Sequence, residues 1–315
     1  MNLKPSAKKR PAKKRRALSV RDGFILGAGA RIYYKTLGHG LPLLVLHGGP
    51  GADHTDFLPA LKSLARRSRL VLIDERGSGR SERLSDPKRY TLDWMVKDIE
   101  RVRKHLRLPQ LVVLGHSFGG ILAQAYAVRH PRRILGLVLA GTGSSAHCVD
   151  RDFRRIRRRL PGPLRARLAR HERAGIFQAD GAYTKGYAAA SSRALAPYMY
   201  AKAPPPRFKH PPPAGMEVLR EMWVRRSDFR IDGNLKGFDF TESLARVRAP
   251  ALVVIGDRDI VSTETAEVTR VSLSRATSVV MAECGHMMYI DQTARFNRLM
   301  EAFLDLCNER RGRKS

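Results

Sequence analysis

A serine between two glycines follows an apolar run in the first half of the chain. Residues 115–119 read Gly-His-Ser-Phe-Gly, the run 111–114 precedes them, and a helix-forming stretch over 120–127 follows. A strand, a sharp turn and a helix in this order are typical of a nucleophile elbow, where glycines allow close backbone approach and the serine is strained. The pattern predicts that Ser117 is a nucleophile, with a plain Gly/Ser turn as the alternative.

A serine hydroxyl is a poor nucleophile near neutral pH unless a base accepts its proton and an acid orients that base. In sheets with such an elbow, the acid and then the histidine follow the serine, each after a later strand. The β-branched run 251–255 leads into Gly-Asp-Arg-Asp at 256–259, and a weaker run, 278–281, leads into Cys-Gly-His at 284–286. Both partners stand in the expected order, so the sequence predicts a Ser/Asp/His triad.

Two aspartates compete for the role of the acid. Loops of this kind usually read Gly-x-x-Asp, which favours Asp259 and leaves Asp257 as a turn or capping residue. The base has several candidates as well, because the chain holds 10 histidines, among them His47 and His116. The position of His286 after the last strand favours it as the base.

The oxyanion of a tetrahedral intermediate needs backbone donors from two loops. The run 43–46 predicts an early strand, and residues 47–51, His-Gly-Gly-Pro-Gly, form the loop after it. Glycines let a backbone N–H approach the oxyanion, and proline fixes the bend, so we predict that the N–H groups of Gly49 and Phe118 are the donors. A phosphate-binding loop is the alternative, but the Gly-x-Gly-x-x-Gly and Lys-Ser/Thr patterns are absent, and we predict no cofactor.

Two of these loops carry a family resemblance. The His-Gly-Gly-Pro-Gly loop and the segment 74–81, Asp-Glu-Arg-Gly-Ser-Gly-Arg-Ser, resemble the proline iminopeptidase branch of the α/β-hydrolase superfamily, over about residues 22–305. Residues 233–239, Gly-Asn-Leu-Lys-Gly-Phe-Asp, resemble the family's return from its cap into its core. Glu75 stands where the family usually has glutamine, and the elbow has a form that is widespread among esterases.

The resemblance implies a serine aminopeptidase that releases N-terminal proline or another small residue from peptides. Such an enzyme is expected to hold the free α-amine with carboxylates of its cap, because a desolvated ammonium needs a negative partner. Asp228 is the first candidate, followed by Glu217 and Glu221, although each fits a surface charge or an arginine partner equally well. Trp223 is a candidate for the pocket lining, with the cap core as its alternative role.

Two other functions stay open at this point. The same triad with an apolar cap pocket would make the chain a carboxylesterase or lactonase that acts on a small ester. A receptor that binds a ligand without catalysis is the third possibility, and the complete triad and oxyanion loop argue against it.

The rest of the chain must position these residues. Its 315 residues and hydrophobic fraction of 43% suit a large core, and apolar runs that alternate with helical stretches predict an α/β fold. We expect the α/β-hydrolase fold, with a mostly parallel, doubly wound sheet and an inserted helical cap. The expected divisions are a basic tail (1–17), the first part of the core (18–143), the cap (144–240), the second part of the core (241–308) and a basic C-terminal tail (309–315).

Two segments of the chain carry part of its formal net charge of +30. Residues 1–16 hold eight Lys and Arg and no acid, and residues 151–174 hold ten Arg against two acids. We expect the first segment to be disordered and to contact anionic polymers non-specifically. No nucleic-acid-binding motif accompanies it. The apolar positions of the second segment follow a helical period, which favours the core of a cap over a membrane face.

Composition also bears on the compartment. No apolar run approaches the roughly 18 residues of a membrane span, and no apolar segment follows the basic N-terminus as a secretion signal would. The three cysteines are an odd number without metal-ligand spacing, which predicts no metal and reduced thiols. These features favour a cytoplasmic protein.

Overall fold

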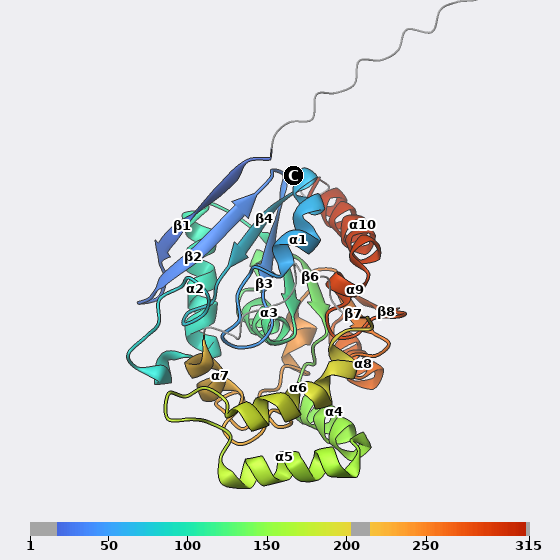
Figure 1. Ribbon diagram of the computed structural model, residues 1–315. Helices are drawn as coiled ribbons and strands as arrows, with labels where there is room; N and C mark the ends of the chain where they lie inside the picture. Colours follow the sequence, from blue (N-terminus) through green and yellow to red (C-terminus); the bar gives the residue numbers. More distant parts are fainter. Residues whose placement is uncertain (1–17, 203–214, 313–315) are drawn as a thin grey trace, which may run out of the picture.

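The computed structural model describes residues 18–202 and 215–312. Within these residues, eight strands form one sheet in the order β1-β2-β4-β3-β5-β6-β7-β8 (Figure 1). β1 and β2 pair antiparallel, β2 pairs antiparallel with β4, and all later neighbours are parallel. The strands are β1 (Val20–Leu26), β2 (Arg31–Leu37), β3 (Leu41–Leu46), β4 (Ser68–Ile73), β5 (Leu111–His116), β6 (Ile134–Ala140), β7 (Ala251–Gly256) and β8 (Ala276–Met281).

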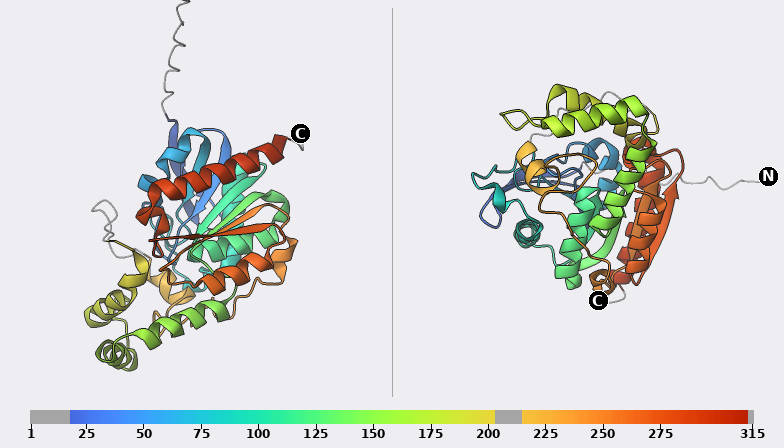
Figure 2. Two further views of the ribbon diagram at one scale, coloured as in Figure 1. Left: turned by 90° about the vertical axis from the view of Figure 1, so that its right-hand side faces the viewer. Right: turned by 90° about the horizontal axis from the view of Figure 1, so that it is seen from below.

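The central strands are mostly apolar because helices cover both faces of the sheet. Successive side chains of a strand point to opposite faces, so Leu44 and Val113 pack in one core, whereas Leu43 and Val112 pack in the other. Helices α2, α3 and α8 lie on the first face, and α1, α9 and α10 lie on the second (Figures 1 and 2). These helices are α1 (Phe57–Leu61), α2 (Leu92–His105), α3 (Phe118–Arg129), α8 (Thr263–Ser272), α9 (Met288–Asp291) and α10 (Thr293–Gly312).

An inserted helical region separates β6 from β7 and lies below the sheet in Figure 1. Its arginine-rich opening forms two helices rather than one, because Pro161 stands between them and cannot continue the first. Phe153 anchors the region with its ring centroid 6.1 Å from that of Trp223 and 6.3 Å from that of Phe229. The helices are α4 (Ala146–Arg159), α5 (Gly162–Ala174), α6 (Lys185–Met199) and α7 (Met216–Met222).

The expected α/β-hydrolase architecture is confirmed: the sheet is mixed but mostly parallel, and it carries an inserted helical region, α4–α7. The C-terminal boundary differs, because α10 continues through Gly312 and so includes residues 309–312 of the segment predicted as a tail. The basic N-terminal tail and the proline-rich stretches at 204–206 and 211–213 lie outside the described residues.

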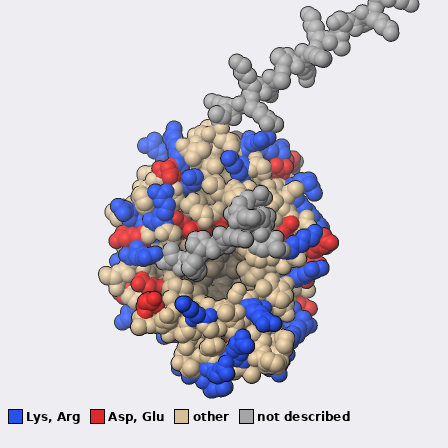
Figure 3. Space-filling view, in the orientation of Figure 1, with Lys and Arg blue, Asp and Glu red and all other residues tan. Residues whose placement is uncertain are grey.

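Two further observations concern the surface. In the view of Figure 3, blue Lys and Arg side chains outnumber red Asp and Glu side chains, and a hollow opens between the core and the cap. Within residues 18–202 and 215–312, no helix is long and apolar enough to cross a membrane.

Candidate active site

Ser117 lies in the turn between β5 and α3 with a backbone conformation that is rare for a residue with a side chain. Its φ is 54° and its ψ is −122°. The flanking glycines explain how the turn closes: a Cβ on Gly115 would lie 2.2 Å from the Gly119 carbonyl oxygen, and one on Gly119 would lie 2.2 Å from that of Leu46. Only glycine fits at both positions, so the sequence forces the strained turn that presents Ser117.

His286 and Asp259 come together from the loops after β8 and β7. His286 Nδ1 lies 2.6 Å from Asp259 Oδ1, and both side chains are buried. Because Nδ1–H donates to the carboxylate, Nε2 is left as the basic nitrogen. Gly141 packs closely against this pair, because a Cβ there would lie 3.1 Å from both Asp259 Oδ2 and His286 Nδ1.

The rival Asp257 has a different position. Its carboxylate accepts the backbone N–H groups of Glu283 (3.1 Å) and Cys284 (2.9 Å). Asp257 therefore fixes the loop that carries His286, while Asp259 contacts the imidazole itself. Cys284 is buried, and burial raises the pKa of its thiol to about 12, so this thiol stays protonated beside the site.

Ser117 and His286 line the same cavity, which has a volume of about 60 Å³. Trp223 from the end of α7 is the part of the predicted substrate-binding set that reaches it. No carboxylate is among the described residues that line it. The remaining lining residues are Ile121, Gly141, Thr142, Gly143, Val149, Phe153, Ile260 and Val261.

The glycine loop after β3 lies directly against the serine. A Cβ on Gly48 would be 3.1 Å from the Ser117 Cβ, and Gly49 has a φ of +59°. Among the described residues, the N–H groups of Gly49 and Phe118 have no hydrogen-bond acceptor. Phe118 is also the first residue of α3, where the helix dipole favours negative charge. The arrangement leaves both predicted donors available for an oxyanion.

His116 has a role that the sequence did not reveal. Its Nε2 lies 2.8 Å from the carbonyl oxygen of His286, and the two rings are 4.7 Å apart between centroids. Burial lowers the pKa of His116 well below its usual range, so the neutral ring donates Nε2–H to that carbonyl. His116 thus positions the backbone of His286. The one sequence signal is its place inside the elbow.

His47 and Glu75 form a buried pair at the base of the glycine loop. Glu75 Oε2 contacts His47 Nε2, and His47 Nδ1 lies 3.1 Å from the carbonyl oxygen of Gly48. Burial raises the pKa of Glu75 well above its usual range and lowers the pKa of His47. A neutral Glu75 that donates to a neutral His47 satisfies both ring nitrogens, because Nδ1–H then faces the Gly48 carbonyl, while Glu75 Oε1 has no partner among the described residues.

Asp228 lies inside the cap. Its two carboxylate oxygens accept the hydroxyls of Tyr183 and Ser191, and its own N–H donates to Tyr187 Oη at 2.6 Å. Burial raises the pKa of Asp228. The carboxylate therefore ties the segment after α7 to α6, and Asp228 does not line the cavity at Ser117.

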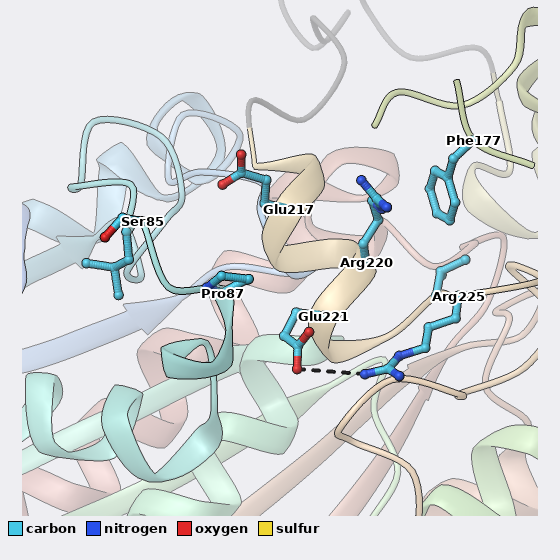
Figure 4. Close-up of a pocket in the computed structure, with 9 residues that line it drawn as sticks. Ser85, Pro87, Phe177, Glu217, Arg220, Glu221 and Arg225 are labelled. Carbon is cyan, nitrogen blue, oxygen red and sulfur yellow. Dashed lines mark ion pairs between the residues drawn. The ribbon is translucent and has the colours of Figure 1, made fainter. Parts of the chain in front are cut away.

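Helix α7 connects the glycine loop to the cavity wall. It begins on that loop, where the Gly215 N–H donates to the Gly51 carbonyl at 3.1 Å, and it ends at Trp223 in the cavity. Glu217 and Glu221 line a second cavity of about 700 Å³, which shares no described lining residue with the first (Figure 4).

The two carboxylates of α7 differ in their partners. Glu221 pairs with Arg225 at 3.8 Å, as the dashed line in Figure 4 marks, and accepts from Asn234 Nδ2 at 3.4 Å. Arg220 lies over the ring of Phe177, 4.9 Å from its centroid. Glu217 is exposed, and its carboxylate has no ion pair or hydrogen bond with any described residue.

No group of three or more His, Cys, Asp and Glu side chains in the described part of the chain could hold a metal ion.

Comparisons with known proteins agree on the architecture. A family model described as "alpha/beta hydrolase fold" matches residues 42–293. Proline iminopeptidase of Lactobacillus helveticus is 28% identical over 93% of this chain and 100% of that protein, and the protein of that name from Saccharolobus solfataricus is 29% identical over 92% and 94%.

Solved structures give the same picture of the fold. The crystal structure of VinJ has a TM-score of 0.81 at 24% identity and covers 91% of this chain and 99% of its own. The proline iminopeptidase of Mycobacterium smegmatis has a TM-score of 0.78 at 23% identity, over 91% and 98%. A structure described as Est816, an N-acyl homoserine lactone degrading enzyme, has a TM-score of 0.63 at 19% identity, over 89% and 100%.

Proposed function

Because the chain belongs to the alpha/beta hydrolase fold family, we propose that it is a serine hydrolase that works through an acyl-enzyme and releases N-terminal proline or another small residue from peptides. The observation that carries the proposal is the strained Ser117 in one cavity with His286, whose Nδ1 lies 2.6 Å from Asp259.

The geometry suggests the following steps. His286 Nε2 takes the proton of Ser117 as Oγ attacks the substrate carbonyl carbon, and the oxyanion accepts the N–H groups of Gly49 and Phe118. The intermediate collapses as its C–N bond breaks, and His286 gives its proton to the departing nitrogen. Water, activated by the same imidazole, then releases the acyl group, while Asp259 stabilises the imidazolium.

Two observations support a peptide substrate with a small N-terminal residue. The relatives named proline iminopeptidase resemble this chain over almost its whole length. In an aminopeptidase the released residue is the acyl group, and a cavity of about 60 Å³ with apolar walls suits a pyrrolidine ring or a small side chain.

The α-amine of such a substrate needs a carboxylate, and Glu217 is the one of the three candidates that no described residue engages. It lies two residues after Gly215, which is bonded to the glycine loop, and it has no described partner. Glu221 and Asp228 are already engaged, by Arg225 and by two hydroxyls respectively. We therefore assign the amine to Glu217.

A small ester is the second candidate substrate. It is favoured by one observation, namely that the described lining of the Ser117 cavity contains no carboxylate. An ester without a free amine needs no such partner, and the triad would cleave its C–O bond by the same steps.

A paired assay separates the two substrates. Proline p-nitroanilide and p-nitrophenyl acetate are each offered to the wild type, to Glu217→Gln and to its matched control Glu221→Gln. We expect Glu217→Gln to lower kcat/KM for the anilide by about 10- to 100-fold, the size of a lost hydrogen bond to a charged group. The acetate should be cleaved at an unchanged rate, and Glu221→Gln should affect neither. Turnover of the acetate alone, with no anilide cleavage in the wild type, would make the esterase the correct assignment.

A further inference from the structure

A cavity of about 850 Å³ lies at the edge of the sheet where the parallel strands β6, β7 and β8 begin. Residues just before or at the starts of these strands line it, together with the last turns of α10, which crosses the sheet in Figure 2. Its charged lining residues are all arginines: Arg132, Arg246, Arg248, Arg275, Arg310 and Arg311.

This cavity is separate from the catalytic one. Ser117 follows the carboxyl end of β5, whereas the arginines stand at the amino ends of the neighbouring parallel strands. A strand of six residues spans about 20 Å, so the length of the strands separates the two sites. A ligand in the second cavity would not touch the triad.

None of the six arginines forms an ion pair with a described residue, and no described Asp or Glu lines the cavity. Some other arginines of the chain are paired, for example Arg76 with Asp98 at 2.8 Å and Arg157 with Glu172. Like charges around a concave surface repel one another and focus a positive potential into it. An anion that entered would relieve that repulsion.

The remaining lining suits a ligand with an apolar part. Ile134, Leu135, Ala249 and Pro250 contribute apolar surface beside the arginines. Cys307 is buried there, and burial raises the pKa of its thiol to about 12, so it adds no negative charge. The volume falls within the range of small-molecule sites.

We propose that this cavity binds a nucleoside di- or triphosphate, with the phosphates on the arginines and the base on the apolar surface. Guanidinium groups bind phosphate oxygens through two parallel hydrogen bonds. Six of them from four segments of the chain can surround a chain of phosphates, and no single segment could do so.

Two triple variants of equal charge test the proposal in the full-length protein. The cavity variant carries Arg246→Gln, Arg248→Gln and Arg275→Gln. The control carries Arg101→Gln, Arg167→Gln and Arg170→Gln, at exposed arginines outside the cavity. Binding of ATP, tripolyphosphate and adenosine is measured by isothermal titration calorimetry at 50 and 200 mM NaCl.

We expect the wild type to bind ATP more tightly than tripolyphosphate, to bind adenosine weakly, and to lose ATP affinity at the higher salt. The cavity variant should weaken ATP binding at least about tenfold, because several charge-assisted hydrogen bonds are lost, and the control variant less than twofold. Equal affinity for ATP and tripolyphosphate would contradict the proposed contact with the nucleoside. The cavity would then be a site for a chain of phosphates alone.

Equal weakening in both triple variants would show a diffuse effect of net charge and overturn the site, as would the absence of ATP binding to the wild type. Thermal melts verify that the variants are folded. If the cavity triple melts early, the single variants Arg248→Gln and Arg275→Gln replace it, and each is expected to weaken ATP binding about threefold relative to Arg101→Gln.

Discussion

The loops of the core and the helices of the cap differ in how firmly the sequence places their functional residues. Ser117 and Asp259 follow buried parallel strands, His286 follows the parallel edge strand β8, and the structure brings the three to one end of the sheet. The cap carboxylates, by contrast, are dispersed: Asp228 is inside the cap, and Glu217 lines another cavity. Parallel strands end at a common edge by construction, whereas an inserted helix can turn any face toward the site. Topology thus places the proposed catalytic residues, and packing places the proposed substrate contacts.

The largest effect is expected for a substitution in the loops of the core. Ser117→Ala removes the nucleophile and should lower kcat by about a million-fold on any substrate that the wild type cleaves. Ser274→Ala, at an exposed serine, is the control. Initial rates with proline p-nitroanilide and p-nitrophenyl acetate give the result. Substantial turnover by Ser117→Ala would place the nucleophile elsewhere and remove the basis of the proposed mechanism.

The next effect separates two aspartates that stand two residues apart. Asp259→Asn should lower kcat by about ten-thousand-fold, because the amide favours the wrong imidazole tautomer. Asp257→Asn should cost far less, since Asp257 accepts only the backbone N–H groups of Glu283 and Cys284. The measurement is kcat for each variant. An equal loss in the two would show that loop position, rather than contact with His286, makes Asp259 important.

The sequence predicted which loops of the core lie together, and it could do so for a physical reason. Apolar β-branched runs mark buried strands, and the order of strands then determines which loops meet, so residues 47–51 and Ser117 could be brought together without coordinates. His116 and Glu75 were not assigned roles, because their importance comes from buried partners across the fold. No local spacing encodes such contacts.

The cap resisted prediction for a different reason. A helical period indicates which side chains of α4 are buried, but it does not give the rotation of one helix against the next. Asp228 looked available from its place before Phe229, and its hydroxyl partners on α6 and beside it became apparent only in the folded chain. Trp223 was a lining candidate with the cap core as its alternative role, and the bond that joins its helix, α7, to the glycine loop became apparent only in the folded chain.

Glu75 tests whether support of the glycine loop belongs to the core machinery. Glu75→Gln keeps a side-chain hydrogen-bond donor for His47 and should retain activity. Glu75→Leu leaves His47 Nε2 only the backbone N–H of residue 75, 3.4 Å away, and should lower kcat/KM by about tenfold. Initial rates across the pH range measure both. Equal losses in the two variants would show that the shape of the residue, and not its proton, supports the loop.

The same residue gives a pH dependence of stability with a definite sign. Burial raises the pKa of Glu75 above its unfolded value, so its contribution to stability is complete below the unfolded pKa and declines as pH rises toward the folded pKa. Each pH unit in that window costs about 1.4 kcal/mol. The wild type should therefore lose Tm faster than Glu75→Gln as the pH rises above the ordinary glutamate pKa of 4.5. If Tm falls equally with pH in the two proteins, Glu75 is ionised in the folded state.

The smallest effect is expected in the cap. There, Asp228→Asn tests whether Asp228, instead of Glu217, binds the α-amine of the substrate. Both carboxylate oxygens of Asp228 already accept hydroxyls from Tyr183 and Ser191, so an incoming ammonium would have to displace them. Asparagine keeps one acceptor and removes a charge whose burial is unfavourable. We therefore expect kcat/KM to change less than about threefold, by the same factor for proline p-nitroanilide and p-nitrophenyl acetate. Ser191→Ala, which alters the same network without touching the carboxylate, is the matched control. A loss confined to the anilide in Asp228→Asn would move the amine from Glu217 to Asp228, and recognition would then lie within the cap instead of on the helix that starts at the glycine loop.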